Sequence, residues 1–317
     1  MDAVLELTNV CKRYDELVAV NDISFTIREG TVTGFIGPNG AGKTTTIKMI
    51  MGLIRPTSGK ILVNGHDVLM DYEKAAANLA GIVETPSFYP YLSGYDNLMQ
   101  SYRIYKNIGK ERLNELINKV GLQGRIHDKV RKYSLGMKQR LGICRALIGT
   151  PKILLLDEPI NGLDLDGVIE FRDLIKNIVQ KENCSILISS HILSEVEKIC
   201  DSIIIINKGQ IKHAAEFNAN AGTTYRIVSE NSEAALSLVS RMPEHDGIDG
   251  IDSIQCRQYD AVTLDVSADS QTIARLIAHL DANGVAITSF APITNSLETE
   301  YMAITQEPAR KSMEDAE

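Results

Sequence analysis

The sequence lacks any long apolar run, because its longest purely aliphatic stretch consists of the four isoleucines 203–206. A membrane-spanning helix needs roughly 18 to 20 apolar residues in succession. The N-terminal region also lacks the positive charge that opens a secretory signal, since it carries Asp2 and Glu6 instead. We therefore expect a chain that is not exported and has no membrane anchor of its own. A role at a membrane then requires a separate partner chain.

Cysteine pairs at metal-binding or redox spacing are also missing. The five cysteines lie far apart, and no C-x-x-C pair occurs. This spacing argues against a disulfide framework and against a structural zinc site. We expect reduced, mostly buried thiols, as in a cytosolic protein. The five residues are Cys11, Cys144, Cys184, Cys200 and Cys256.

Composition is ordinary, but charge is unevenly distributed. With 44% hydrophobic and 23% charged residues, the 317-residue chain is neither disordered nor low in complexity. Residues 1–217 carry 27 Lys/Arg and 25 Asp/Glu, whereas residues 218–317 carry 6 and 16. This shift predicts two differently built domains, 1–217 and 218–317. The acidic second domain would repel nucleic acid and anionic lipid headgroups.

The first domain alternates strand and helix patterns, which predicts an α/β fold with buried central strands. Apolar or β-branched runs predict strands at 4–10, 18–27, 31–36, 153–156 and 186–188. Helical periodicity occurs at 43–51, 95–105, 110–120, 137–149, 165–181 and 193–200.

The second domain follows a linker-like segment at 217–224, rich in Asn, Ala, Gly and Thr. The order is strand (225–229), helix (233–241), strand (251–257), strand (261–266), helix (270–282) and strand (285–290). Such a βαββαβ order predicts a small α+β domain of the ferredoxin-like kind. A last helical pattern at 295–304 precedes an acidic end that we expect to be frayed.

A phosphate-binding pattern, G-x-x-x-x-G-K-[ST], lies between a predicted buried strand and a predicted helix. Backbone N–H groups of this loop would surround phosphate oxygens, and the start of the helix adds a favourable field. Lys43 would supply a positive charge to the β- and γ-phosphates, and the Thr44 hydroxyl would bind Mg²⁺. The candidate nucleotide contacts are Gly37, Pro38, Asn39, Gly40, Ala41, Gly42, Lys43, Thr44 and Thr45.

Two acids, Asp157 and Glu158, directly follow the apolar run 153–156. The carboxyl end of a strand faces the ligand crevice of an open α/β sheet. Asp157 can therefore join the Mg²⁺ shell, while Glu158 can polarise an attacking water molecule.

Four further segments resemble the motifs of ABC ATPases, in the order of that family. The segment from Tyr133 to Arg140 resembles the signature loop, and residues 160–164, ending in Asp164, resemble the D-loop. His191 resembles the switch histidine, and Tyr14 resembles the aromatic residue that stacks on adenine. The resemblance covers roughly residues 3–215.

The resemblance implies an antiparallel β subdomain, a RecA-like α/β core and a helical subdomain. It implies that two ATPase chains, identical or related, close head to tail around two ATP molecules with Mg²⁺. The phosphate loop of one chain would then face Ser134, Gly136 and Met137 of the other. His191 would hold the γ-phosphate and the attacking water in register, and Asp164 would tie the two sites together. A separate permease would hold the chain at the cytoplasmic side of the cell membrane, and no nucleic acid is expected.

Two departures from the family pattern point to a branch. The usual Ser-Gly-Gly-Gln is replaced here by Ser134-Leu-Gly-Met137, which resembles the drug, bacitracin and lantibiotic exporters. Glu84 stands where the family usually has a glutamine, as in lantibiotic-immunity exporters. Its carboxylate would bind Mg²⁺ beside the nucleotide, or it is an ordinary loop acid. The aromatic segment 86–98 would receive a permease helix, or it packs in the core.

These patterns favour an ATP-hydrolysing subunit of an exporter for a peptide antibiotic, lantibiotic or other drug. One alternative is the ATPase of a nutrient importer whose C-terminal domain is regulatory. Another is a soluble ABC ATPase that acts in translation or DNA repair. A P-loop kinase or GTPase does not fit the signature-like loop or the Asp-Glu-Pro order at 157–159.

Overall fold

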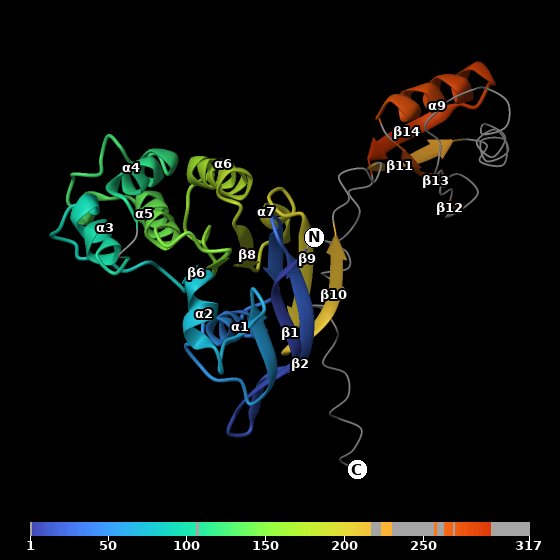
Figure 1. Ribbon diagram of the computed structural model, residues 1–317. Coiled ribbons are helices and arrows are strands. Elements are labelled where there is room, and N and C mark those ends of the chain that lie inside the picture. Colours follow the sequence, from blue (N-terminus) through green and yellow to red (C-terminus); the bar gives the residue numbers. More distant parts are fainter. Residues whose placement is uncertain are drawn as a thin grey trace, which may run out of the picture. The chain divides into compact units, whose positions relative to one another are not determined.

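A computed structural model describes residues 2–105, 108–216, 223–229, 257–258, 263–268 and 270–292 (Figure 1). The chain divides into two compact units. The first extends to Glu216, and the second contains the described elements between residues 223 and 292.

An antiparallel sheet forms one layer of the first unit. Its order is β2-β1-β4-β5. Leu5 and Leu7 of β1 and Ile23 and Ile27 of β2 are buried and are separated by more exposed residues, so one face of the sheet lies in the core. The strands are β1 (Ala3–Tyr14), β2 (Leu17–Arg28), β4 (Ser58–Val63) and β5 (His66–Asp67).

A second sheet has the order β10-β9-β3-β8-β7-β6, in which all neighbours are parallel except β10 and β9. Every residue of β3, β7 and β8 is buried, as expected of parallel strands covered on both faces. The strands are β3 (Val32–Ile36), β6 (Leu79–Ile82), β7 (Ile153–Leu156), β8 (Ser185–Ser190), β9 (Ser202–Asn207) and β10 (Gln210–Glu216).

The core of this unit joins both sheets to helix α1 (Lys43–Ile50). Ile47 and Ile50 of α1 share one buried cluster with residues of β1, β2, β7, β8 and β9. Helix α6 (Leu165–Glu182) buries one side, which includes Phe171 and Ile175. Two shorter helices, α2 (Tyr72–Ala77) and α7 (Leu193–Val196), complete the α/β part.

A group of helices stands at one end of the first unit (Figure 1). It contains α3 (Gly94–Tyr102), α4 (Lys110–Lys119), a 3₁₀ turn (Val130–Lys132) and α5 (Leu135–Leu147). Ser93 and Ser134 cap α3 and α5 by accepting a hydrogen bond from the backbone N–H three residues ahead. Both serines therefore fix where these helices begin.

The second unit has an antiparallel sheet of order β12-β13-β11-β14, along which α9 (Ser270–Ala282) lies (Figure 1). Ile273, Leu276 and Leu280 of α9 are buried. The strands are β11 (Thr223–Ser229), β12 (Arg257–Gln258), β13 (Thr263–Ala268) and β14 (Ile287–Pro292). The predicted helices at 233–241 and 295–304 and most of the predicted strand at 251–257 lie outside the described residues, so the ferredoxin-like assignment stays a prediction.

The secondary structure differs from the sequence pattern in several places. The helix expected at 193–200 ends at Val196. The sequence pattern does not predict helix α2 or strands β4, β5, β6, β9 and β10. Strand β5 has only two residues, and β4, β6 and β10 are exposed in part. Strand β9 did carry a signal, because it contains four consecutive isoleucines that are buried. Cys144, Cys184 and Cys200 are buried, which confirms the predicted burial of these three thiols. No helix within the described ranges has the length and apolarity to cross a bilayer.

Candidate nucleotide-binding site

The loop from Gly37 to Gly42 connects β3 to α1, as the sequence predicts. Gly37 N–H donates a 3.2 Å hydrogen bond to the Ser190 carbonyl at the end of β8. Gly42 has φ +109°, and a Cβ there would lie 2.7 Å from the Ala19 carbonyl oxygen. Only glycine fits this position, so the loop enters α1 tightly against β2.

Lys43 is the first residue of α1 and is only 5% exposed. Its Nζ donates hydrogen bonds to the carbonyls of Gly37 (2.6 Å) and Pro38 (3.2 Å). The same ammonium lies 3.2 Å from Oε1 of Glu158. The Lys43 ammonium is thus held beside the phosphate loop by two neutral carbonyl acceptors and one carboxylate. A bound phosphate would compete with these groups for the ammonium.

Thr44, in the first turn of α1, meets Asp157, which directly follows β7. Thr44 Oγ1 donates to Asp157 Oδ2 at 2.8 Å, and Ser189 Oγ donates to Asp157 Oδ1 at 2.6 Å. Hydroxyl and carboxylate oxygens are the donors that Mg²⁺ prefers, and it usually keeps several waters and binds substrate phosphates as well. This donor set therefore fits Mg²⁺. No group of three or more His, Cys, Asp or Glu suited to a metal occurs in the described part.

Glu158 lies between Lys43 and His191. Its Oε2 is 2.9 Å from His191 Nδ1, and its backbone N–H donates to Ser189 Oγ at 2.8 Å. Its Oε1 is buried and accepts no hydrogen bond from a described residue, so the Lys43 contact is an ion pair without hydrogen-bond alignment. Glu158 also has φ +48°, a costly conformation that occurs often at functional sites. A buried acceptor of this kind is satisfied by a water or ligand group.

A cavity of about 560 Å³ opens above the phosphate loop. Five of its residues were not predicted: Leu17, Val18, Ala19, Lys208 and Gly209. The first three carried a sequence signal, because they follow Tyr14 at the start of an apolar run. The other two carried none, since they lie over 160 residues beyond the loop that they border. The remaining lining residues are Tyr14, Asn39, Gly40, Gly42, Lys43, Thr44, Thr45 and Glu158.

Tyr14 is the last residue of β1 and one wall of this cavity. Its side chain is 43% exposed, and Lys12 Nζ lies 4.7 Å from the ring centroid. An exposed ring beside a cavity is available to stack on a base. Its predicted role as the adenine contact stays a prediction.

The signature-like residues lie away from the cavity of their own chain. Ser134 caps α5 and accepts a 3.2 Å hydrogen bond from Met137 N–H, and Gly136 lies within the first turn of α5. Asp164 caps α6 and accepts a 3.0 Å hydrogen bond from Gly167 N–H. Ser134, Gly136, Met137 and Asp164 do not line the cavity. Helix α5 belongs to the separate helical group in Figure 1.

Glu84 follows β6, the strand beside β7, so it stands near Asp157 along the sheet edge. Asp157 N–H in fact donates to the Ile82 carbonyl at 2.9 Å. The Glu84 side chain is nevertheless 74% exposed, and its Oε1 lies 3.4 Å from Lys48 Nζ of α1. It does not line the cavity.

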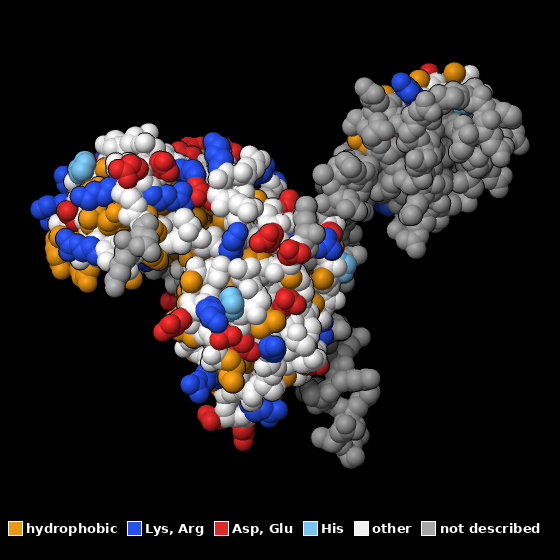
Figure 2. Space-filling view, viewed as in Figure 1, with side chains coloured by type: hydrophobic (Ala, Val, Ile, Leu, Met, Phe, Trp, Pro, Cys, Tyr) orange, Lys and Arg blue, Asp and Glu red, His pale blue; other side chains and the backbone are white. Residues whose placement is uncertain are grey.

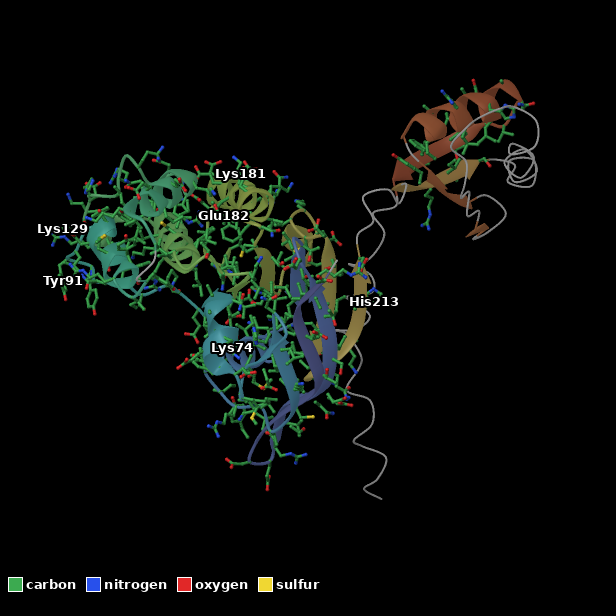
Figure 3. The ribbon with its side chains drawn as sticks, in the orientation of Figure 1. Lys74, Tyr91, Lys129, Lys181, Glu182 and His213 are labelled. Carbon is green, nitrogen blue, oxygen red and sulfur yellow. The ribbon has the colours of Figure 1, made fainter. Side chains whose placement is uncertain are left out.

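The aromatic segment is only partly packed. Tyr89 and Tyr91 are 55% and 64% exposed, and their ring centroids are 6.1 Å apart. Phe88 lies under the guanidinium of Arg145, whose pKa is lowered by burial. Tyr91 points away from the helical group in Figure 3. Neither tyrosine behaves as a core residue.

Comparison with known proteins now decides the family. The ABC transporter family model matches residues 20–161. An uncharacterised ABC transporter ATP-binding protein of Bacillus subtilis, YhcH, is 40% identical over 97% of both chains. The chain belongs to the ATP-binding proteins of ABC transporters. It is therefore an ATP-binding and ATP-hydrolysing subunit with the expected cassette fold.

Named relatives include two kinds of antibiotic transport subunit. The bacitracin transport ATP-binding protein BcrA of Enterococcus faecalis is 33% identical over 95% of this chain and 96% of its own. The lantibiotic transport ATP-binding protein SrtF of Streptococcus pyogenes is 40% identical over 68% of this chain and 93% of its own. A solved ATP-binding subunit of an ABC transporter covers 67% of this chain at 31% identity, with a TM-score of 0.61.

Proposed function

We propose that this ABC ATPase powers the export of a peptide antibiotic through a separate permease, and that the site described above is its ATP site. The observation that carries the proposal is the similarity to a bacitracin transport subunit over nearly the whole of both chains. That similarity includes the second unit, which a bare cassette lacks. We also propose that residues 1–217 form the ATPase domain and residues 218–317 an accessory domain.

Lys43 is the proposed primary phosphate ligand. Its ammonium rests on two carbonyls and on Glu158. The negatively charged oxygens of a phosphate group are stronger acceptors than these carbonyls, so we expect the Lys43 ammonium to pair with the β- and γ-phosphates when ATP binds. This exchange frees Glu158 Oε1 for its part in the reaction.

Thr44 Oγ1 and Asp157 are the proposed protein ligands of Mg²⁺, with Ser189 orienting the carboxylate. A Mg²⁺ ion held by these two residues would supply positive charge to offset the negative charge of the phosphates. Glu84 is the weaker candidate for this shell, because its carboxylate faces Lys48 and solvent. Its exposed position at the sheet edge favours a role in coupling to the permease.

Glu158 is the proposed general base, and His191 its partner. Glu158 Oε2 and His191 Nδ1 lie 2.9 Å apart. This contact fixes the carboxylate, so that Oε1 faces the position a water would occupy beside the γ-phosphate. His191 then holds the carboxylate and the water in register while the bond to phosphate forms.

A second ATPase chain completes the proposed site. Ser134, Gly136 and Met137 do not reach the cavity of their own chain. They open α5, whose free N–H groups and positive end suit a γ-phosphate presented by another chain. A solved bacterial ABC transporter cassette of the same fold is described as a dimer. Asp164, at the start of α6, would connect the two sites.

The permease contact is proposed at the aromatic segment beside Glu84. Tyr89 and Tyr91 expose large apolar rings there. Figure 2 shows hydrophobic side chains exposed over the α3 end of the helical group, mixed with Lys and Arg. Apolar anchors of this kind bind a partner helix. This contact would hold the chain at the cytoplasmic side of the membrane.

One reconstitution tests the proposal. The chain should be purified from native membranes with the permease that accompanies it, and the pair placed in lipid vesicles. We expect a peptide antibiotic such as bacitracin to raise ATPase activity and to be moved by the vesicles. Glu158→Gln should still bind ATP but abolish transport. Co-purification with ribosomes or DNA, or stimulation only by an import substrate, would contradict it.

A further inference from the structure

We infer that Lys208, in the turn between β9 and β10, is a second phosphate-binding cation of the nucleotide site. Lys208 lines the same cavity as the phosphate loop and Tyr14. The inference rests on the proposed function, because it adds a ligand contact to that ATP site. No motif points to this residue.

The turn is fixed to the site by Gly209. Gly209 N–H donates to the Ala41 carbonyl of the phosphate loop at 2.9 Å, and Asn21 N–H of β2 donates to the Gly209 carbonyl at 2.8 Å. A Cβ on Gly209 would lie 2.9 Å from the Ala19 carbonyl oxygen. The turn therefore cannot move independently of the phosphate loop, and Lys208 is held at its side.

The charges of the cavity leave a place for Lys208. Its lining contains two cations and one carboxylate: Lys43, Lys208 and Glu158. Lys43 and Glu158 already face each other at 3.2 Å. Lys208 is exposed and has no hydrogen bond or ion pair with any residue that the structure describes. Its ammonium is thus the cation left to meet the negative charge of a polyphosphate.

The backbone gives an independent argument. The two-residue turn has φ +48° at Lys208 and φ +75° at Gly209, and Asn207 pairs with Gln210 across it. A turn with both central residues left-handed favours Asn-Gly or Asp-Gly. Lysine gains nothing from this conformation. Backbone conformations of high energy cluster at ligand-binding sites, where the side chain's contact with the ligand is the reason for keeping them.

The same geometry supplies a clean variant. Lys208→Asn removes the charge and suits the turn better, so it should fold at least as well as the parent chain. Lys208→Arg keeps the charge. Lys212→Asn is the matched control, because Lys212 lies on β10, bonds Gln210 Oε1 at 3.1 Å and does not line the cavity.

The measurement is equilibrium binding of ATP, ADP and adenosine by displacement of a fluorescent adenine nucleotide, in a Glu158→Gln background that prevents turnover. We expect Lys208→Asn to lower the affinity for ATP and for ADP about 5-fold to 20-fold at low salt. The loss of affinity should be smaller at high salt. Adenosine affinity should not change. Lys208→Arg and Lys212→Asn should bind like the parent chain.

Unchanged ATP and ADP affinity in Lys208→Asn would overturn the inference. An equal loss for adenosine would also overturn it, because the contact would then not be to phosphate. Lys43→Ala separates this result from the proposed function. If Lys43→Ala loses ATP affinity while Lys208→Asn keeps it, the role of Lys208 is wrong but the proposed ATP site stands. If Lys43→Ala binds ATP normally, the ATP site itself has been misplaced.

Discussion

Ser189 connects the two acids of the site without facing the cavity. It is fully buried, donates to Asp157 Oδ1 at 2.6 Å and accepts from Glu158 N–H at 2.8 Å. One hydroxyl therefore sets the orientation of the proposed Mg²⁺ ligand and the backbone of the proposed base. No sequence motif distinguished it from Ser190, its neighbour on β8.

We predict that Ser189→Ala lowers kcat or Mg²⁺ affinity about 10-fold to 100-fold, the usual effect of losing a group that orients a ligand. Ser185 at the other end of β8 is the control, since it is equally buried and accepts from Gly30 N–H at 2.9 Å. Both variants should lose about 1 kcal/mol of unfolding free energy. Steady-state kinetics over a Mg²⁺ titration, with urea unfolding, separates the two effects. Equal kinetic losses would contradict the orienting role.

At the scale of elements, Glu182 ties α6 to the helical group. Its carboxylate, only 8% exposed, pairs with Arg112 and Lys119 of α4. Figure 3 places Glu182 at the end of α6. A second pair on the same helix, Arg140 with Glu170, is open to solvent, because Glu170 is 58% exposed. The two pairs differ mainly in burial.

Burial predicts different costs for the two pairs. Glu182→Gln leaves two partly buried cations without their counter-charge and should lower the unfolding free energy by about 2–3 kcal/mol. Glu170→Gln should change it by less than about 1 kcal/mol. Chemical denaturation of both variants at neutral pH measures the difference. Similar stabilities would show that α4 and α6 are joined by packing alone.

At the scale of the whole molecule, the buried thiols predict that the folded state loses stability at alkaline pH. Burial raises the pKa of Cys144 and of Cys184 to about 12, and it also raises the pKa of Cys200. The folded chain thus holds these protons more tightly than the unfolded chain. Their stabilisation is present below the unfolded pKa near 9 and is lost as pH rises toward 12.

We therefore predict that the unfolding free energy falls between pH 9 and 11, by up to about 1.4 kcal/mol per thiol for each pH unit. Denaturant titrations at several pH values measure this slope. Thiol labelling supplies the control in a Cys256→Ser background. Cys11, which is half-buried, should react quickly, and the three buried thiols only as the chain unfolds. Rapid labelling of Cys144, Cys184 and Cys200 in the folded chain would contradict their burial.

Local sequence determined the parts of the site that lie on one continuous segment. The phosphate loop, Lys43 and Thr44 could be predicted because a glycine pattern between a buried strand and a helix encodes its own geometry. Asp157 and Glu158 could be predicted because they end an apolar strand. The motif set also placed the chain in its family, which the comparisons confirmed.

Tertiary structure decided what those residues touch. Lys208 and Gly209 border the phosphate loop only because β9 lies beside β3 in the sheet. Ser189 reaches both acids because β8 lies between β3 and β7. Glu84 turns outward because its backbone has φ +61° after β6, which its sequence position did not reveal. Side-chain direction and long-range pairing depend on how strands are ordered, and no short segment contains that information.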